Sequence, residues 1–337
     1  MADGQKSSEC RELLKVRGVT KRFRLEAGLF ASGKKQVFAL NGVSFSVAEG
    51  ETYGLVGESG SGKSTLAKCI ADVYSCDEGE MIFFSRGTAF RLDATERKRH
   101  PLLNQKIKYV FQDPAASLDP RMTVEEILTI GVRYAKLYSR SQARDKAAFL
   151  LEAVGMAADS LKRRPADFSG GQRQRISLAR ALMSDPELLI CDEVVSALDV
   201  SIRGQILNLL NRLKKEFGFA MLFIAHDLSV VSYISDRIGV MYGGRLMEEG
   251  SVRELFDRPL HPYTQLLLSC VPDSGGEFLR TSGSGEPFDA VNPPIGCPFA
   301  PRCPIADSEC RKKDALSAVR ATKERLCLCL KRNQLSK

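Results

Sequence analysis

The sequence predicts an α/β protein with a largely parallel β-sheet. Three observations indicate this class: strand-like and helical apolar patterns alternate along the chain, a glycine-rich loop lies between an apolar run and a helical pattern, and Pro, Gly and Ser become frequent after Pro259. The chain has 337 residues, 44% of them hydrophobic, which is enough to bury a large core. These figures exclude disordered, collagen-like and disulfide-dependent miniproteins.

The expected elements follow one another along the body of the chain. Apolar runs of alternating or continuous pattern predict strands at 13–23, 43–47, 51–56, 107–111, 188–191, 220–225 and 238–247. Helical spacing predicts helices at 63–71, 171–183 and 203–215, and a helical pattern throughout 123–154. Residues 25–36 carry glycines among charges and are expected to form a loop.

Membrane-spanning and secretory segments are not expected. No stretch approaches the roughly 18–20 consecutive apolar residues of a transmembrane helix. Met1 to Cys10 are polar and lack the apolar segment of a secretory signal. We therefore expect a soluble protein that is made and kept in the cytoplasm.

The net charge and the cysteines are concentrated at the C-terminal end. From Cys297 onward, ten Lys and Arg against four Asp and Glu contribute +6 of the formal +8, and five of the ten cysteines lie there. An enzyme of nucleic acids more often has a basic face across its main body. In a cytosolic chain, a local cysteine cluster indicates metal ligation rather than disulfides. We place a domain boundary near Pro259, before a cysteine-rich extension over 259–337.

The segment from Gly57 to Ser64 fits the phosphate-binding P-loop, in which Gly, four residues and Gly-Lys-Ser follow one another. Glycines allow successive backbone N–H groups to point at phosphate oxygens, and the following helix adds the positive end of its dipole. Lys63 can reach the β- and γ-phosphates, and the Ser64 hydroxyl can bind Mg²⁺. The apolar run before the loop and the helical pattern after it make a chance glycine-rich turn the weaker interpretation.

A second motif ends the strand at 188–191 with the pair Asp192 and Glu193. A carboxylate at the C-terminal edge of a parallel sheet can hold Mg²⁺ through water, which we predict for Asp192. Glu193 is the natural base for polarising an attacking water molecule. Strands often end in acidic residues, so this pair indicates a nucleotide site only in combination with the P-loop.

A third motif, from Phe168 to Arg175, places two glycines at the start of a helix and so creates another anion-binding N-terminus. One nucleotide needs one phosphate loop, so a second, separate motif suggests a shared site. With this segment the chain resembles the ATPase subunit of ATP-binding-cassette (ABC) transporters, whose signature is Leu-Ser-Gly-Gly-Gln; Phe168 replaces the Leu. The resemblance implies a P-loop fold with a nucleotide-binding domain over 1–258 and a helical subdomain at about 115–183.

The resemblance also implies the residues of an ATP site shared between two subunits that meet head to tail. The nucleotide-binding residues would be Phe23, Gly57, Ser59, Gly60, Ser61, Gly62, Lys63, Ser64 and Thr65, with Ser169, Gly170, Gly171, Gln172 and Asp199 acting across the dimer. Phe23 would stack on adenine, although a role in the core is almost as plausible. Mg²⁺ would be bound by Ser64, Gln112 and Asp192, and Glu193, His226 and Gln112 would be catalytic.

One position departs from the family pattern. Val194 stands where these ATPases usually have Pro after the Asp-Glu pair. Pro fixes φ and Val does not, so the loop is expected to be less rigid. We expect hydrolysis to survive because Glu193 is intact; a non-hydrolysing regulatory subunit is the alternative.

Several segments resemble the oligopeptide and dipeptide importers within this family. They are 111–114, 117–121, 202–210, 261–264, 292–297 and 301–304. The insertion at 25–36 and Pro120-Arg121 resemble the second of the two ATPase subunits of these importers. The resemblance implies ATP-driven peptide uptake at the cytoplasmic face of the inner membrane, with nickel or another small solute as the alternative cargo. The implied partners are a second ATPase subunit (copy or paralogue), two membrane permeases and, indirectly, a solute-binding protein.

The cysteine spacing leaves the metal open. Five residues separate Cys297 from Cys303 and six separate Cys303 from Cys310, whereas structural zinc sites usually pair cysteines two to four residues apart. Iron–sulfur clusters tolerate wider spacing, and the family resemblance implies a four-iron four-sulfur cluster. The fourth ligand would be Cys327, with Cys329 as the alternative. Zinc, or reduced cysteines without metal, remain the other interpretations.

An ABC-type ATPase acting on DNA or the ribosome is the competing class. Its DNA-repair members separate the two motifs by long insertions, whereas 106 residues lie between Gly62 and Ser169 here. Translation-type members carry two cassettes, and this sequence has no internal repeat. The basic C-terminal end is the one feature in its favour, so we expect no nucleic-acid partner.

Overall fold

The computed structural model describes residues 11–24, 36–113, 117–271, 288–312, 319–320 and 325–331. The loop expected at 25–36 lies outside these residues except for Gln36, as do Cys10 and Pro114.

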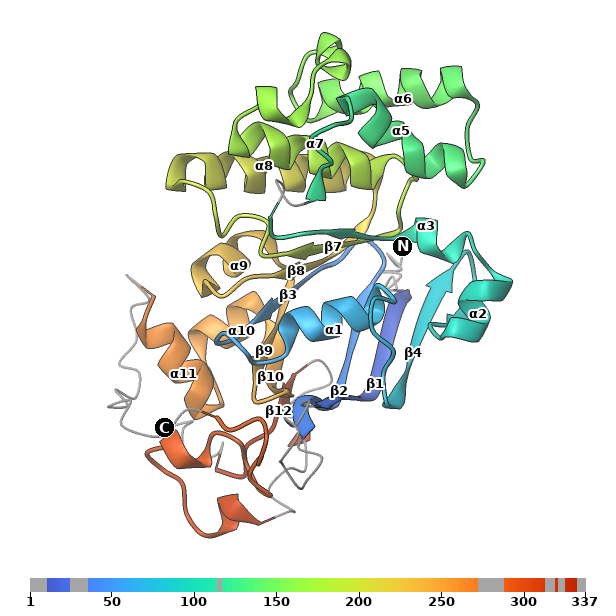
Figure 1. Ribbon diagram of the computed structural model, residues 1–337. Helices are drawn as coiled ribbons and strands as arrows, with labels where there is room; N and C mark the ends of the chain where they lie inside the picture. Colours follow the sequence, from blue (N-terminus) through green and yellow to red (C-terminus); the bar gives the residue numbers. More distant parts are fainter. Residues whose placement is uncertain are drawn as a thin grey trace, which may run out of the picture.

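The centre of the molecule is an eight-stranded sheet (Figure 1). Its order is β11-β12-β10-β9-β3-β8-β7-β6. The parallel strands are β6 (Ile107–Val110), β7 (Leu188–Asp192), β8 (Ala220–Ile224), β3 (Thr52–Val56) and β9 (Arg237–Tyr242). The antiparallel strands are β10 (Arg245–Ser251), β12 (Leu326–Cys327) and β11 (Val319–Arg320). The predicted α/β class with a parallel sheet therefore holds for the part of the sheet that carries the motifs.

A second, antiparallel sheet was not predicted. Its order is β2-β1-β4-β5, with β1 (Glu12–Arg24), β2 (Gln36–Ala48), β4 (Glu78–Ser85) and β5 (Thr88–Arg91). The sequence pattern indicated two strands here, 13–23 and 43–47, but not that they pair with each other and with β4.

The helices gather on both sides of the sheet, and one group forms a layer at the top of Figure 1. This layer contains α5 (Val124–Tyr134), α6 (Arg140–Ala153), α7 (Gly170–Leu182), α8 (Val200–Phe217) and the 3₁₀ turns η1 (Ala158–Lys162) and η2 (Pro165–Asp167). The helical pattern expected throughout 123–154 is interrupted because Ser139 forms a capping box with Gln142 and so begins a new helix. Helix α1 (Lys63–Ile70) follows the P-loop.

The remaining helices lie outside this layer and connect the strands or pack against the sheets. They are α2 (Ala94–Arg99), α3 (Leu103–Lys106), α9 (Leu228–Ile234), α10 (Val252–Asp257), α11 (Pro262–Ser269), η3 (Ala300–Arg302) and η4 (Glu309–Arg311). Among the described residues, no helix combines the length and the apolar character needed to cross a bilayer.

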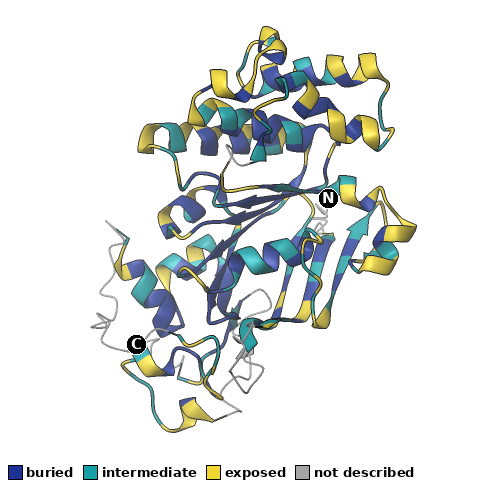
Figure 2. Cartoon of the chain, in the orientation of Figure 1, coloured by how far each residue is buried: buried dark blue, intermediate teal, exposed yellow. Residues whose placement is uncertain are grey.

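The core consists of two apolar clusters, one on each face of the central sheet, and Figure 2 shows this sheet as buried. Strand β7 contributes to both, since Leu189 and Cys191 belong to one cluster while Leu188 and Ile190 belong to the other. All five of its residues are buried, as expected for a parallel strand covered on both faces. Such burial fixes the end of β7, where the acidic pair lies.

The C-terminal residues pair with the central sheet. In β12, Cys327 lies opposite Glu248 and Leu326 opposite Glu249, and the N–H of Leu328 donates to the carbonyl of Met247 at 2.7 Å. The boundary near Pro259 stays a prediction.

Candidate functional site

The P-loop joins β3 to α1 in a conformation that only glycine adopts easily. Gly57, Gly60 and Gly62 have φ angles of +151°, +79° and +102°. A Cβ atom on Gly57 would lie 2.1 Å from the carbonyl oxygen of Met241, and one on Gly62 would lie 2.4 Å from that of Ala39. Ser59 and Ser61 complete the loop, and Thr65 lies in the first turn of α1.

Lys63 extends into the curl of this loop. Its Nζ donates to the carbonyl oxygens of Gly57 at 2.7 Å and Glu58 at 2.9 Å, and to Oγ of Ser61 at 3.2 Å. Burial lowers the pKa of Lys63, and the negative charges of Glu193, Asp192 and Glu58 oppose that shift. A cation surrounded by backbone groups is positioned to meet phosphate oxygens.

Ser64 and Asp192, both predicted to bind Mg²⁺, lie in contact. The Ser64 hydroxyl donates to Oδ1 of Asp192 at 3.0 Å, and the hydroxyl of Tyr109 donates to Oδ2. Oxygen donors from a hydroxyl and a carboxylate are the ligands that Mg²⁺ prefers, so this pair fits the ion. Burial, together with the Asp192 charge, raises the pKa of Tyr109, which keeps its hydroxyl a donor.

The structure brings the three predicted catalytic residues together. Nε2 of Gln112 donates to Oε2 of Glu193 at 3.0 Å, and Nδ1 of His226 lies 3.9 Å from Oε1 of the same carboxylate. Three strands meet here, since Gln112 follows β6, Glu193 follows β7 and His226 follows β8. The parallel strands therefore deliver these side chains to one edge of the sheet.

The backbone at Glu193 is held in the left-handed region, with φ of +50°. Its N–H donates to the carbonyl of Ile224 at 2.9 Å, and its own carbonyl accepts from Oγ of Ser196 at 2.8 Å. Val194, which departs from the family pattern, is buried. The burial of Val194 and these two hydrogen bonds therefore hold the loop after β7, a restraint that Pro usually provides in this family.

The predicted adenine-stacking residue lies at the end of β1. The Phe23 ring meets the Tyr74 ring edge-on, with 5.2 Å between centroids, and the side chain is partly exposed. Nζ of Lys21 lies 5.4 Å from the centroid of this ring, and the stacking role stays a prediction.

The signature segment borders a different cavity. Ser169 caps α7 and forms a capping box with Gln172. A cavity of about 480 Å³ beside this cap is lined by Ser169, Gly171 and Gln172 among others, and by no residue of the P-loop. A Cβ atom on Gly170 would meet open space. Asp199 precedes α8 at its N-cap position without capping the helix with its side chain.

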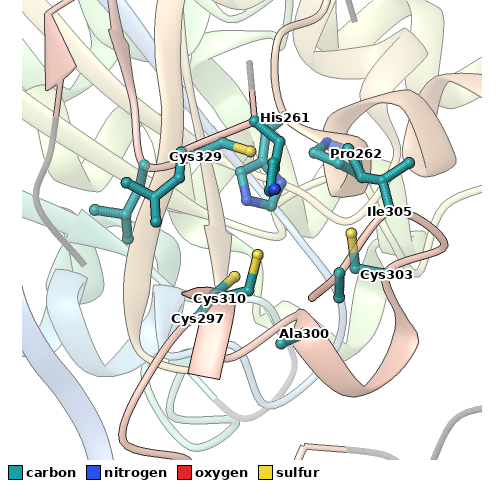
Figure 3. A pocket seen from close by; sticks show the side chains of 12 residues that line it. His261, Pro262, Cys297, Ala300, Cys303, Ile305, Cys310 and Cys329 are labelled. Atoms are coloured by element: carbon teal, nitrogen blue, oxygen red, sulfur yellow. The ribbon is translucent and has the colours of Figure 1, made fainter. Parts of the chain in front are cut away.

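Four of the five C-terminal cysteines line one small cavity of about 20 Å³ (Figure 3). We call this the cysteine pocket; it is lined by Cys297, Cys303, Cys310 and Cys329 with His261. Cys327, predicted first as the fourth ligand, is fully buried and does not line it. Burial raises the pKa of Cys297 to about 12 and that of Cys329 to about 11.

The cysteine pocket supplies a suitable donor type but no formed metal centre. Four thiols facing one cavity match the ligands of iron–sulfur clusters. Within the described part of the chain, however, no group of three or more His, Cys, Asp or Glu residues is placed so that it could hold a metal ion.

Sequence reasoning missed two features of the site. Tyr109 gave no signal, because a tyrosine in a strand is ordinarily a packing residue. The second is an ion pair between Glu58 of the P-loop and Arg302, which are 244 residues apart. The proximity of Arg302 to Cys303 was the one available hint, and no local pattern identifies its partner.

Comparisons with known proteins agree with this geometry. The family model described as ABC transporter matches residues 40–196, and the one described as oligopeptide/dipeptide transporter, C-terminal region, matches 247–310. The oligopeptide transport ATP-binding protein AppF of Bacillus subtilis (strain 168) is 45% identical over 310 residues, which are 89% of this chain and 92% of AppF. OppF of Salmonella typhimurium (strain LT2) is 43% identical over 305 residues, which are 88% of this chain and 90% of OppF.

A solved structure also resembles the chain. It is the dimeric post-hydrolysis state of the ATP-binding cassette MJ0796 bound to ADP and Pi, with a TM-score of 0.61 and 27% identity. The match covers 72% of this chain and 99% of MJ0796.

Proposed function

Because this chain belongs to the oligopeptide transport ATP-binding proteins of the ABC transporter family, it is an ATPase, and we propose that its ATP hydrolysis powers the import of oligopeptides through separate permease subunits. The observation that carries this proposal is the convergence of Gln112 and His226 on Glu193, beside the Ser64–Asp192 pair. The names of the relatives favour peptides over nickel as cargo.

The residues divide the chemistry of hydrolysis among them. Lys63 neutralises charge on the β- and γ-phosphates, and Ser64 and Asp192 would hold Mg²⁺, which supplies further neutralisation. Glu193 orients a water molecule and accepts its proton as the oxygen attacks the γ-phosphorus, and ADP leaves. His226 would contact the γ-phosphate, and Gln112 holds the Glu193 carboxylate in place.

A second ATPase subunit, a copy or a paralogue, would complete the site. The cavity beside Ser169 contains no P-loop residue, which supports a nucleotide bound between two chains. Ser169, Gly171 and Gln172 of one subunit would then face the γ-phosphate held by the other. Loss of that phosphate would open the dimer, which makes the dimer a two-state element controlled by a ligand.

A permease would dock beside β6. A cavity of about 280 Å³ lies there between α5 and α7 and is lined by Lys108, Ile130 and Arg180 among others. Burial lowers the pKa of both Lys108 and Arg180. Two cations beside an exposed Ile130 suit the C-terminal end of a short permease helix, which carries partial negative charge. Strand β6 leads from this cavity to Gln112, which connects docking to the site.

We propose that the chain is a peripheral subunit at the cytoplasmic face of the cell membrane. A solute-binding protein would deliver peptide to the permeases from the other side. We retain the proposed division into a nucleotide-binding domain over 1–258, with its helical subdomain at about 115–183, and an extension over 259–337.

The cysteine pocket is the proposed place of a four-iron four-sulfur cluster. Cys297, Cys303, Cys310 and Cys329 would be its ligands, and Cys329 replaces Cys327 in this proposal because it lines the cavity. The cluster with four thiolates is anionic, and the basic C-terminal end offsets that charge. Iron, zinc and acid-labile sulfide assays on anaerobically purified protein test the assignment; zinc without sulfide would contradict it.

Transport itself is tested on the complete importer in vesicles. The complex contains this chain, its permeases and the second ATPase subunit, with both ATPase subunits on the inner side of the vesicle membrane. These vesicles should take up labelled oligopeptide only when ATP is enclosed in them. The matched control is the same complex carrying Glu193→Gln. Uptake of Ni²⁺ without peptide uptake, or equal uptake by the variant complex, would contradict the proposed function.

A further inference from the structure

The P-loop is held from outside the nucleotide-binding domain by an ion pair. Nη1 of Arg302 donates to both carboxylate oxygens of Glu58, at 3.0 Å and 2.8 Å. Glu58 is the second residue of the P-loop, whereas Arg302 ends η3, one residue before Cys303 of the cysteine pocket. The two segments that the sequence analysis assigned to separate functions are therefore in direct contact.

A second contact holds the backbone of the same residue. The N–H of Glu58 donates to Oη of Tyr263 at 2.8 Å, and Tyr263 is fully buried in α11. Burial raises the pKa of Tyr263, so its hydroxyl remains neutral. Both the main chain and the side chain of Glu58 are thus fixed by residues beyond Pro259.

Arg302 itself is held by a rigid support. Its N–H donates to the carbonyl of Phe299 at 3.0 Å, and its guanidinium also donates to Oη of Tyr242 at 3.3 Å. The Phe299 ring is fully buried and packs against the rings of Tyr242 and Tyr263, with centroids 5.4 Å and 5.3 Å apart. The Arg302 side chain is 16% exposed and that of Glu58 is 41% exposed, so the ion pair is shielded from solvent on the arginine side.

Glu58 also contacts Lys63, the cation that is expected to bind phosphate. The carbonyl oxygen of Glu58 accepts from Nζ of Lys63 at 2.9 Å. A displacement of Glu58 therefore changes the surroundings of Lys63. In addition, the Glu58 carboxylate lies on the loop that receives polyphosphate, so its negative charge repels ATP unless Arg302 neutralises it.

We infer that Arg302 is a positioning residue for the P-loop, and that through it the C-terminal extension sets the affinity for ATP. This inference rests on the proposed function of the P-loop. It adds a dependence of ATP affinity on the C-terminal extension, which the ATPase mechanism itself does not require. Arg302 acts through Glu58 in two ways: it fixes the loop, and it cancels a charge that opposes nucleotide binding.

The test measures the dissociation constant of a fluorescent ATP analogue with Mg²⁺ on the full-length chain. Arg302→Gln should weaken binding about tenfold, the loss expected for one charge-assisted contact. Adding Glu58→Gln to Arg302→Gln should recover most of that loss, because the unpaired carboxylate is removed. Arg302→Lys, which keeps the positive charge but replaces the planar guanidinium by a smaller ammonium group, should bind with intermediate affinity.

The matched control is Arg253→Gln, which breaks the exposed Arg253–Asp257 ion pair on α10 and touches neither the P-loop nor the cysteine pocket. It should bind the analogue like wild type. A purely structural Arg302 would lower the unfolding temperature but leave the dissociation constant unchanged, and that result would overturn the inference. Failure of Glu58→Gln to restore binding would also overturn it. A wild-type chain that binds no nucleotide would instead overturn the proposed function.

Discussion

Nε2 of Gln112 donates a hydrogen bond to Oε2 of Glu193 at 3.0 Å, across 81 residues of sequence. Gln112 follows the strand that borders the proposed permease cavity, and Glu193 is the proposed base. The Gln112 side chain therefore connects the strand that borders the proposed permease cavity to the carboxylate of the proposed base. We expect occupancy of the cavity beside β6 to change the rate of hydrolysis through this contact.

Replacing Glu193 by Gln should remove the base while preserving shape. Loss of one general base typically lowers turnover by about 10²–10⁴-fold, so we expect a decrease in that range with ATP affinity retained. Steady-state phosphate release and equilibrium binding measure the two quantities. Glu216→Gln, at an exposed position of α8, is the control. Wild-type turnover in Glu193→Gln would discard Glu193 as the base.

Replacing Tyr109 by Phe should weaken the response to Mg²⁺. The variant keeps the ring but loses the hydrogen bond to Oδ2 of Asp192, which then moves more freely and lacks one partner. We expect a higher Mg²⁺ concentration for half-maximal turnover and a stability loss of about 1–3 kcal/mol. Tyr138→Phe, which removes a tyrosine–aspartate bond at the remote Asp185, is the matched control. An unchanged Mg²⁺ titration would show that Tyr109 only packs.

The P-loop glycines should differ in their tolerance of a methyl group. Gly57→Ala places a Cβ atom 2.1 Å from the carbonyl of Met241 and should abolish ATP binding and destabilise the fold. Gly60→Ala meets open space, so its cost is the strain of a positive φ, about 1 kcal/mol. Urea unfolding together with nucleotide binding measures both. Equal effects of the two substitutions would argue against the packing described at Gly57.

Alkylation should separate buried from exposed cysteines. Burial raises the pKa of Cys69 to about 12, and only the thiolate reacts. Because its pKa is raised, the reactive fraction of Cys69 at pH 8 is about 10⁻⁴ and increases about tenfold with each pH unit. Cys270 is exposed and should react first. Peptide mapping after iodoacetamide treatment measures each site; similar rates for the two cysteines would contradict the burial of Cys69.

Much of the ATP site was predictable because each part has a local signature. The P-loop, the Asp192–Glu193 pair and His226 all follow buried strands, and the carboxyl ends of parallel strands meet at one edge of the sheet. Their convergence therefore follows from the fold class. The second sheet was missed because it depends on pairing between distant segments, such as Leu14 with Phe83, which no local pattern specifies.

The residues that control the site from a distance were also beyond sequence reasoning. Glu58 occupies one of the four variable positions of the P-loop pattern, and Arg302 was noted only as part of segment 301–304. Spacing left the choice between Cys327 and Cys329 open for a related reason. Strand β12 ends at Cys327, so the turn that follows, rather than strand alternation, directs Cys329 into the cysteine pocket.

The pairing of β12 with β10 also has a consequence for solubility. A long strand at a sheet margin exposes backbone donors and acceptors that can recruit a strand from another molecule. Among the described residues, the two-residue strand β12 pairs with Glu248 and Glu249 of β10, and the two-residue strand β11 lies beyond it. Removing residues 325–331 would uncover those backbone groups, so we expect this segment to reduce edge-to-edge association between molecules.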